Sequence, residues 1–481
     1  MKARSRVTRV SGMVSIMLSF GLIVAAVEVG GVHAASTDPA LVGQWTAPIT
    51  MPFVGIHSMV MRNGSVLLFD RSLGNRGSPG VLFNPATGAM VDVRIPYPRD
   101  AFCAGHNILP DGSVFVTGGH PPVSGHPGIG VKLTDVFNPI AKTWTPGPTL
   151  DQARWYPSNV SLGDGTTLIF SGNEVPGDPV LTVDRYDPAT GQLTTLPATA
   201  NRKLTLYPKL HLMANGKVFL AGASRVGAWF DPDTATWSAA PRMVQGRKSF
   251  ASVVLPDQRV MAIGGTGPKS SAEIVDLSAA NPAWKLTAPM HFGRTHPNAV
   301  LLPDGKVFVV GGGASGEFTG PVLTPELYNP ATNTWTDMAP QQAQRMYHGT
   351  AVLLPDGRVL SAGSNFGPLQ KTYEIYSPPY LFAGTRPVIS AAPTNVGYGQ
   401  TFQLTSGNSQ GIAKVVLMHP GSSTHSLNLE QRALNLPFTK SGSTVTATLP
   451  ANSDQAVPGW YMVFLVSDSG VPSVASWVRL G

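Results

Sequence analysis

The stretch that decides the fold is residues 299–312, which read Ala-Val-Leu-Leu-Pro-Asp-Gly-Lys-Val-Phe-Val-Val-Gly-Gly. A short apolar run leads into the tight turn Pro303-Asp304-Gly305, and a second apolar run ends at paired glycines. Asp-Gly and Asn-Gly are strong hairpin signals because these residues accept a positive φ at low cost. The stretch therefore predicts a β-hairpin.

The same pattern recurs seven times along the chain. The six other turns are Arg62-Asn63-Gly64, Pro110-Asp111-Gly112, Gly163-Asp164-Gly165, Ala214-Asn215-Gly216, Pro256-Asp257-Gln258 and Pro355-Asp356-Gly357. Successive turns lie 42 to 53 residues apart, which matches the length of a kelch-type propeller blade, about 50 residues. Most hairpins are followed by a third strand that ends in a turn such as Asn329-Pro330-Ala331-Thr332. A fourth strand then often carries a tryptophan, as at Trp144, Trp237, Trp284 and Trp335.

The seventh repeat lacks this fourth strand. After Tyr373-Glu374-Ile375-Tyr376 the chain passes into Ser377-Pro378-Pro379 without the expected tryptophan. A matching segment, Gly43-Gln44-Trp45-Thr46-Ala47-Pro48, precedes the first hairpin instead. We expect this N-terminal strand to complete the last blade and close the ring, so that no sheet edge stays open. The fold class is therefore all-β, with a seven-bladed kelch-type β-propeller.

The repeat stops near Arg386. Residues 386–481 hold strand-like runs such as Ser443 to Leu449 and Tyr461 to Val466, in a segment of the length of one immunoglobulin-like β-sandwich. We therefore predict a propeller over residues 35–385 and a sandwich over residues 386–481.

Residues 1–34 have the pattern of a secretory signal peptide. A basic head precedes the apolar run Met13 to Val27, and Val32-His33-Ala34 ends in small residues; this run is short for a membrane span. A retained N-terminal anchor is the alternative. We expect a secreted protein, either periplasmic or extracellular, that is monomeric.

The composition narrows the class of function. Charged residues make up only 13%, while 52 Gly and 43 Pro punctuate short apolar runs, which is typical of a turn-rich all-β protein. Lys and Arg are scattered, without the basic runs that follow a phosphate backbone. The sequence therefore excludes nucleic acid as a partner.

One position in each repeat gathers residues that can carry chemistry. Counting back nine residues from the last turn residue of each hairpin gives Gly55, Cys103, Tyr156, Tyr207, Ser249, His296 and His348. We expect these residues to start inner strands on one face, near the propeller axis, and four of the seven are Tyr or His. Imidazole and phenolate are suitable ligands for Cu(II), and Tyr347 stands beside His348. Cys103 is the only cysteine. A leftover thiol in a secreted protein indicates intermolecular pairing or a special thiol, and a small buried hydrophobe is the alternative.

Four motifs resemble the galactose oxidase and glyoxal oxidase family of copper-radical oxidases. They are Phe102-Cys103-Ala104-Gly105, Ala153-Arg154-Trp155-Tyr156, Arg345-Met346-Tyr347-His348, and Gly421-Ser422-Ser423-Thr424-His425 with Gln431-Arg432. The resemblance covers essentially the whole chain after the leader, with the motifs in the family's order.

The resemblance implies one copper ion held by Tyr156, Tyr347, His348 and His425. Tyr156 would be cross-linked by a thioether to Cys103 and would hold a tyrosyl radical, and Tyr347 would be the axial phenolate that takes the substrate's hydroxyl proton. The expected reaction converts a primary alcohol or a hydrated aldehyde plus O2 into the carbonyl or acid plus hydrogen peroxide. The catalytic residues would then be Cys103, Tyr156 and Tyr347, and the substrate a small alcohol or aldehyde, with carbohydrate as a further candidate.

Several neighbouring positions qualify this assignment. The family places a ring over the cross-linked tyrosine at a position that here falls on Glu174, so a carboxylate is expected where the radical needs cover. Trp155 resembles the glyoxal oxidase branch. Arg225 and Tyr207 are candidates to line the pocket, although Arg225 is equally typical of a strand-end surface charge. His296 is either a support for the site or a structural histidine.

Two other functions compete with the oxidase. The first is a secreted propeller without catalysis that binds glycan or protein, since the fold alone does not decide function. The second is a hydrolase, which has little support because many acidic residues sit in the repeated turns and no nucleophile elbow is present. The set of Cys103, Tyr156, Tyr347, His348 and His425 favours the oxidase, because a binding module has no need for it.

Overall fold

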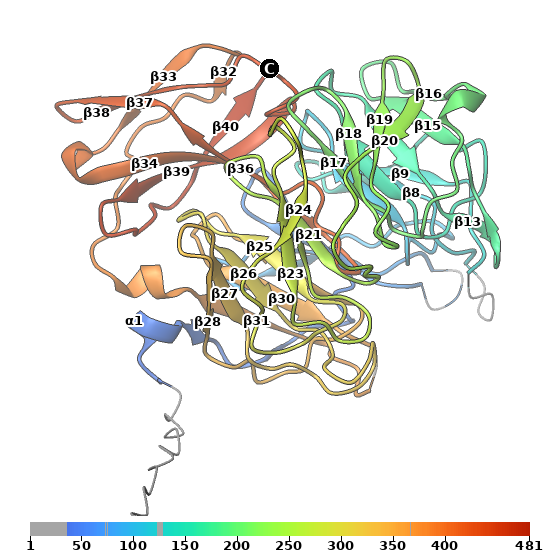
Figure 1. Cartoon of the computed structure of the whole chain (residues 1–481), viewed down its shortest axis with the longest axis horizontal. Coiled ribbons are helices and arrows are strands. Elements are labelled where there is room, and N and C mark those ends of the chain that lie inside the picture. The colour runs from blue at the N-terminus through green and yellow to red at the C-terminus, as the bar shows by residue number, and fades with distance from the viewer. Residues whose placement is uncertain (1–35, 73, 75, 123–127, 366) are drawn as a thin grey trace, which may run out of the picture. The chain divides into compact units, whose positions relative to one another are not determined.

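Seven antiparallel sheets of four or five strands form the blades in the computed structural model (Figure 1), which describes residues 36–481 except 73, 75, 123–127 and 366. The predicted signal peptide therefore lies outside the described residues. Blade 1 holds β3 (His57–Val60), β4 (Val66–Phe69), β5 (Gly80–Phe83) and β6 (Met90–Asp92). Blade 2 holds β7 (Gly105–Ile108), β8 (Val114–Thr117), β9 (Thr134–Asn138) and β10 (Thr143–Pro146). Blade 3 holds β11 (Ser158–Ser161), β12 (Thr167–Phe170), β15 (Val183–Asp187) and β16 (Gln192–Thr195), with the side ribbon β13 (Asn173–Val175) and β14 (Asp178–Pro179).

The remaining blades repeat this order. Blade 4 holds β17 (Lys209–Leu212), β18 (Val218–Ala221), β19 (Ala228–Asp231) and β20 (Thr236–Ala239). Blade 5 holds β21 (Ala251–Val254), β22 (Val260–Ile263), β23 (Ala272–Val275) and β24 (Trp284–Leu286). Blade 6 holds β25 (Asn298–Leu301), β26 (Val307–Val310), β27 (Glu326–Asn329) and β28 (Thr334–Asp337). Blade 7 holds β29 (Gly349–Leu353), β30 (Val359–Gly363) and β31 (Thr372–Ser377), completed by β1 (Gln44–Trp45) and β2 (Ile49–Thr50). The helical segments are short: α1 (Pro39–Val42), η1 (Ala198–Ala200), η2 (Pro379–Phe382) and η3 (Ser409–Gly411).

All seven predicted hairpin turns share one hydrogen-bond pattern. In each turn the last residue's N–H donates to a carbonyl three residues earlier, as Gly305 does to Leu302. The Asp or Asn side chain of the turn accepts from the N–H two residues on, as Asp304 does from Lys306 at 3.2 Å. Gln258, which replaces the usual glycine, adopts the same positive φ of 69°. The hairpin prediction is confirmed.

The ring closes as the sequence predicted. Gln44 and Trp45 pair with Ser377 and Tyr376 at the outer edge of blade 7. The Trp45 indole N–H donates to the carbonyl of Ala339 in the preceding blade at 2.7 Å. Trp335 makes the equivalent bond to Ala288 at 2.8 Å, so the N-terminal strand takes the place of a regular fourth strand.

An immunoglobulin-like sandwich follows the propeller, and its strands are coloured orange to red in Figure 1. One sheet holds β32 (Asn395–Val396), β40 (Ser476–Leu480), β39 (Gly459–Ser467), β34 (Ile412–His419) and β36 (Arg432–Leu436), and the other holds β33 (Thr401–Thr405), β38 (Thr444–Thr448) and β37 (Phe438–Ser441). Between β34 and β36, the short strand β35 (Ser422–Ser423) leaves the sandwich and pairs with β3 of blade 1. The sandwich thereby contributes a strand to the propeller.

Buried arginine–carboxylate pairs recur between the segment that enters a blade and the third strand of that blade, a feature that the sequence did not predict. The pairs are Arg99–Asp135, Arg154–Asp184, Arg247–Glu273, Arg294–Glu326 and Arg345–Glu374, in blades 2, 3, 5, 6 and 7. Each arginine stands two to four residues before its blade's candidate site position. Each also donates to a carbonyl near the end of the blade's second strand, as Arg247 does to Gly264 at 2.7 Å. These pairs hold the segment that enters each first strand.

In the described part of the chain, no helix is long and apolar enough to cross a membrane.

Candidate metal and substrate site

The positions found by counting back from the hairpin turns share an unusual backbone. Each lies one or two residues before the first strand of its blade, and in five of the seven neighbouring pairs of blades the first strands pack side by side. The six that are not glycine have φ values in the left-handed region: Cys103 63°, Tyr156 64°, Tyr207 46°, Ser249 50°, His296 53° and His348 65°. This region is costly for residues with a Cβ, and such strain concentrates at functional sites. The predicted equivalence of these positions is confirmed.

Three of the predicted residues bring ligand atoms together. One atom each from Cys103, His348 and His425 lies within 4.8 Å of the other two, and all three side chains are buried. The Cys103 Sγ lies 3.8 Å from Nε2 of His425. His425 also has a left-handed φ of 48° and follows β35, the strand that the sandwich adds to blade 1. Residues more than 300 positions apart thus meet at the propeller axis.

The two imidazoles are oriented by hydrogen bonds at their Nδ1 atoms. His348 Nδ1 lies 2.6 Å from the amide oxygen of Asn365, which can only accept a hydrogen bond. His425 Nδ1 lies 2.5 Å from the hydroxyl of Thr424, which itself donates to the Ile56 carbonyl at 3.0 Å. Both rings therefore carry the proton on Nδ1 and present the Nε2 lone pair, the arrangement in which histidine binds a metal. Burial lowers the pKa of His348 to about 3 and places that of His425 well below its ordinary value, which keeps both rings neutral.

Two tyrosine hydroxyls meet beside these histidines. The hydroxyl groups of Tyr156 and Tyr347 are in direct hydrogen-bond contact. The Tyr156 ring lies 4.8 Å from the His425 ring, and the Tyr347 ring lies 3.8 Å from the His348 ring. Burial raises the pKa of both phenols above the ordinary value, so each would need a nearby cation to become a phenolate at neutral pH. Two imidazoles and two phenols make a mixed N,O ligand set suited to a borderline divalent metal.

Cys103 is fully buried and adjoins Tyr156 through the backbone, since the Tyr156 N–H donates to the Cys103 carbonyl at 3.0 Å. Burial raises the pKa of the Cys103 thiol well above its usual range. Cys103, Tyr156 and Tyr207 belong to one buried cluster around the axis. The thiol and the phenol predicted to be linked therefore share one dry environment.

The rings that cover Tyr156 differ from the expectation. Trp155 stacks on Tyr156 with ring centroids 3.9 Å apart and planes 15° apart, and Tyr207 stacks on it at 4.3 Å and 23°. Two rings this close and this nearly parallel cannot fit side by side on one face of a phenol, so they cover opposite faces. The expectation that Glu174 occupies the covering position is wrong. Sequence counting missed this cover because it comes from the residue adjacent to Tyr156 and from the next blade.

A chain of hydrogen bonds lies beneath the site and was not predicted. Ser422 Oγ lies 2.5 Å from His106 Nδ1, and His106 Nε2 lies 3.0 Å from His57 Nδ1. The His57 ring lies 5.9 Å from that of His425. Both histidines belong to first strands, two and three residues after Gly55 and Cys103. Comparing the residues two and three positions after each counted site position would have revealed His57 and His106.

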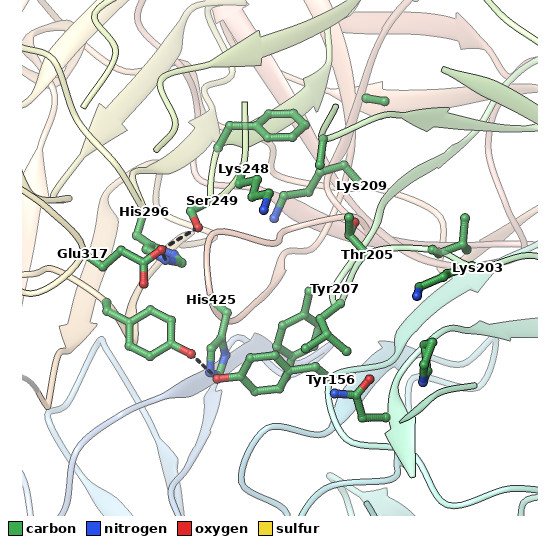
Figure 2. Close-up of a pocket in the computed structure, with 18 of the residues that line it drawn as sticks. Tyr156, Lys203, Thr205, Tyr207, Lys209, Lys248, Ser249, His296, Glu317 and His425 are labelled. Carbon is green, nitrogen blue, oxygen red and sulfur yellow. Dashed lines mark hydrogen bonds and ion pairs between the residues drawn. The ribbon is translucent and has the colours of Figure 1, made fainter. Parts of the chain in front are cut away.

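A cavity of about 570 Å³ opens onto these residues (Figure 2). Its lining includes Tyr156, Tyr207, His296, Tyr347 and His425. Tyr207 therefore lines the cavity as expected. Arg225 does not belong to its lining and donates instead to the Met243 carbonyl at 2.9 Å.

His296 has a partner that the sequence did not reveal. Its Nε2 lies 3.3 Å from a carboxylate oxygen of Glu317, which also accepts from the Ser249 hydroxyl at 3.1 Å. The His296 ring packs edge-on against Tyr347, with centroids 4.6 Å apart. The bond to His296 lowers the pKa of Glu317, so Glu317 is an anion at neutral pH. Of the two alternatives for His296, this geometry favours a support for Tyr347.

Comparison with known proteins matches both parts of the chain. Residues 267–380 match the glyoxal oxidase N-terminus family, and residues 386–480 match the galactose oxidase-like early set domain. These matches support the resemblance to the galactose oxidase and glyoxal oxidase family that the motifs indicate. Among similar proteins, galactose oxidase of Gibberella zeae is 29% identical over 91% of this chain and 70% of its own length. Aldehyde oxidase GLOX of Vitis pseudoreticulata is 29% identical over 92% of this chain and 97% of its own length.

A solved structure resembles the chain over nearly its whole described length. It is a fungal alcohol oxidase of the AA5 family in complex with copper, 26% identical, with a TM-score of 0.81 over 91% of this chain and 99% of that one. The likeness to this structure covers the propeller and the sandwich together.

Proposed function

We propose that this protein is a copper-radical oxidase that converts a primary alcohol or an aldehyde, with O2, into the aldehyde or acid and hydrogen peroxide. The observation that supports this most directly is the convergence of Cys103, His348 and His425 on one point beside the paired hydroxyls of Tyr156 and Tyr347. A glycan- or protein-binding propeller has no use for two imidazoles whose lone pairs face two phenols and a buried thiol. The copper bound by the related AA5 alcohol oxidase fits this ligand set.

Each residue has a distinct part in the proposal. His348 and His425 hold the copper through Nε2, because Asn365 and Thr424 occupy their Nδ1 atoms. Tyr156 would also hold the copper, joined by a thioether to Cys103, and would carry the radical. Tyr347 would hold the copper as a phenolate and take the hydroxyl proton of the substrate, since it lines the cavity and touches Tyr156. Trp155 and Tyr207 exclude water from both faces of the Tyr156 ring.

The stoichiometry requires two electrons and two protons from each alcohol. Copper held by these residues would accept one electron, and the Tyr156 radical would accept the other. The balanced reaction is RCH2OH + O2 → RCHO + H2O2, and a hydrated aldehyde gives the acid in the same way. Trp155, beside Tyr156, resembles the glyoxal oxidase branch of the family. This resemblance favours small aldehydes or simple alcohols as substrates.

The first experiment measures the intact mass of the copper-loaded protein together with thiol labelling. Formation of the thioether removes two hydrogens, protects Cys103 from labelling and gives a cross-linked Cys103–Tyr156 peptide. The matched control is Cys103→Ser, which should bind copper and show no loss of mass. A freely labelled Cys103 after full copper loading would refute the radical mechanism and favour the binding propeller. Hydrogen peroxide release from primary alcohols or aldehydes, absent in Tyr156→Phe, completes the test.

We further propose that the protein is exported and acts as a monomer. The pattern of residues 1–34 supports export. N-terminal sequencing of protein recovered outside the cytoplasm should begin just after Ala34, and a retained leader would instead indicate an anchor. Sedimentation of the exported protein should give a single species with the mass of one chain.

A further inference from the structure

The cavity beside the candidate metal site has an unbalanced charge. Three lysines line it, Lys203, Lys209 and Lys248, against the single carboxylate of Glu317. Figure 2 shows Lys209 and Lys248 on one side of the cavity, and Tyr156 and His425 on the other. The positive charge is therefore separated from the place where the reaction would occur.

Glu317 does not neutralise these lysines. Its carboxylate is 3.3 Å from His296 Nε2 and accepts from the Ser249 hydroxyl at 3.1 Å. Among the described residues, none of the three lysines lies within ion-pair distance of a carboxylate. Burial lowers the pKa of His296, so the ring adds no positive charge of its own at neutral pH. The net charge of the lining is thus about +2 with the lysines protonated.

Lys209 is the most unusual of the three because it is buried. Its ammonium group donates to the Ser426 carbonyl at 3.1 Å and lies 5.8 Å from the centroid of the Phe250 ring. An ammonium group has three N–H donors, so this carbonyl leaves two of them for the cavity. Burial lowers the pKa of Lys209 to about 7, the behaviour of a cation that lacks a counter-ion. A carboxylate bound in the cavity would supply that counter-ion.

We propose that this cavity selects substrates that carry a carboxylate several bonds away from the oxidised carbon, with Lys209 as the principal anion-binding residue and Lys203 and Lys248 as support at the rim. The inference rests on the proposed function, because it names the substrate class of the same site. A cavity of about 570 Å³ holds a molecule larger than a two-carbon aldehyde. The reacting end lies at Tyr347 while the carboxylate accepts hydrogen bonds from Lys209.

The test compares molecules that differ in charge but little in shape. Calorimetry on the copper-loaded full chain would measure the binding of pentanoate and of pentanamide, neither of which has a hydroxyl to oxidise. A charge-assisted hydrogen bond predicts that pentanoate binds about tenfold more tightly or better. Turnover would then compare 5-hydroxypentanoate with 5-hydroxypentanamide, and the same preference should appear in kcat/KM.

Variants locate the preference. Lys209→Met should remove it, while Lys209→Arg should retain most of it. The matched control is Lys285→Met, which removes an exposed lysine on β24 outside the cavity and should change nothing. If Lys209→Met fails to fold, the double variant of exposed residues Lys203→Met and Lys248→Met should still reduce the preference several-fold, and added salt should reduce it further.

The outcomes separate this inference from the proposed function. Equal binding of pentanoate and pentanamide by the parent chain would overturn the inference, even if both hydroxy compounds were oxidised. A preference that survives in Lys209→Met would also overturn it, because it would indicate a carboxylate bound directly by the metal. A lysine-dependent binding preference in a protein that releases no hydrogen peroxide would support the anion site and refute the oxidase.

Discussion

Blades 4 and 5 are neighbours with the same strand order, but they differ at their inner edges. In blade 5, Arg247 and Glu273 form a fully buried ion pair at 2.7 Å. Glu273 pairs with the third residue of its blade's second strand, and the residue in the same register of blade 4 is Ala228. Thr205, two residues before Tyr207, stands where blade 5 has Arg247 and lines the cavity. Blade 4, which lacks the ion pair, contributes more residues to the cavity lining than blade 5, which supplies Lys248, Ser249 and Phe250.

Blade 1 extends this comparison. Where blade 5 has Glu273, blade 1 has Val81 in the same register. Where blade 5 has Arg247, two residues before Ser249, blade 1 has Phe53, two residues before Gly55. Blade 1 instead accepts β35 from the sandwich, which leads directly to His425. The two blades that lack the repeated ion pair thus differ from the others in a second way: blade 4 supplies a large share of the cavity lining, and blade 1 pairs with a strand of the sandwich.

The largest expected effect comes from removing one member of an ion pair in blade 5. Arg247→Met leaves the Glu273 carboxylate buried without its cation, and such a loss costs about 3–5 kcal/mol of unfolding free energy. The double variant Arg247→Met with Glu273→Met should lose less than the single variant, because no uncompensated charge is left. Denaturant midpoints measured by tryptophan fluorescence compare the two. Equal losses would show that the carboxylate's charge is not what makes the single variant unstable.

Buried neutral histidines make the fold sensitive to acid, and blade 4 holds one of them. Burial lowers the pKa of His211, on β17, to about 3, and its Nε2 lies 2.8 Å from the Ser252 hydroxyl. The unfolded chain binds a proton below about pH 6.5 while the folded chain does not, so stability falls as the pH drops through this range. From pH 7 to pH 5 this one histidine costs about 2 kcal/mol.

The substitution His211→Gln keeps a side chain that can bond Ser252 and removes the titration. The unfolding free energy of this variant should change less between pH 7 and pH 5 than that of the parent chain, by about that same amount. His106 and His419 are buried with lowered pKa values as well, so part of the acid sensitivity remains. An unchanged pH profile would place the acid-sensitive contacts outside blade 4.

A graft tests whether the missing ion pair is what opens the cavity. Thr205→Arg with Ala228→Asp would restore the pair in blade 4, at little net change in stability because buried pairs roughly break even. The new guanidinium would turn toward the new carboxylate and tighten the segment that carries Tyr207. We expect kcat/KM to fall about tenfold or more, or about 1.4 kcal/mol, with copper binding and the thioether unchanged. Thr205→Val, which adds no pair, is the matched control and should leave kcat/KM nearly unchanged.

The sequence predicted the parts of this molecule that depend on local signals. The turn chemistry at Asp304-Gly305 and its equivalents located every hairpin, and Trp45 located the closing strand, because each signal lies within a few residues. The shared position of Tyr156 and His348 followed from the same local count. The ligand set itself required the resemblance to a known family, since His425 has no repeat around it.

The remaining features depend on contacts between distant residues. Arg247 and Glu273 are 26 positions apart, and neither residue differs in type from an ordinary surface charge. The stacking of Trp155 on Tyr156 depends on a side-chain rotamer, which spacing cannot predict. In the sequence, nothing distinguishes Lys209 from an ordinary strand residue. Its burial and its bond to the Ser426 carbonyl are seen only in the structure. Sequence thus predicted the blades and named the candidate ligands, which stay a prediction, whereas the pocket and its charge required the structure.

The smallest expected effect lies at the exposed margin of an ion pair in blade 6. His291 Nδ1 is 2.6 Å from Asp337, and its backbone N–H donates to Glu326, the partner of Arg294. The bond to Asp337 raises the pKa of His291 above 6.5. The pair therefore stabilises the fold fully below about pH 6.5 and loses this contribution as the pH rises through the raised value. Because the imidazole is 54% exposed, the contribution is a few tenths of a kcal/mol.

His291→Gln should lower the thermal midpoint slightly at pH 5.5 and leave it unchanged at pH 9, the opposite pH dependence to that of the buried His211. A larger loss at pH 9 than at pH 5.5 would mean that His291 acts through packing on the ion pair and not through its charge.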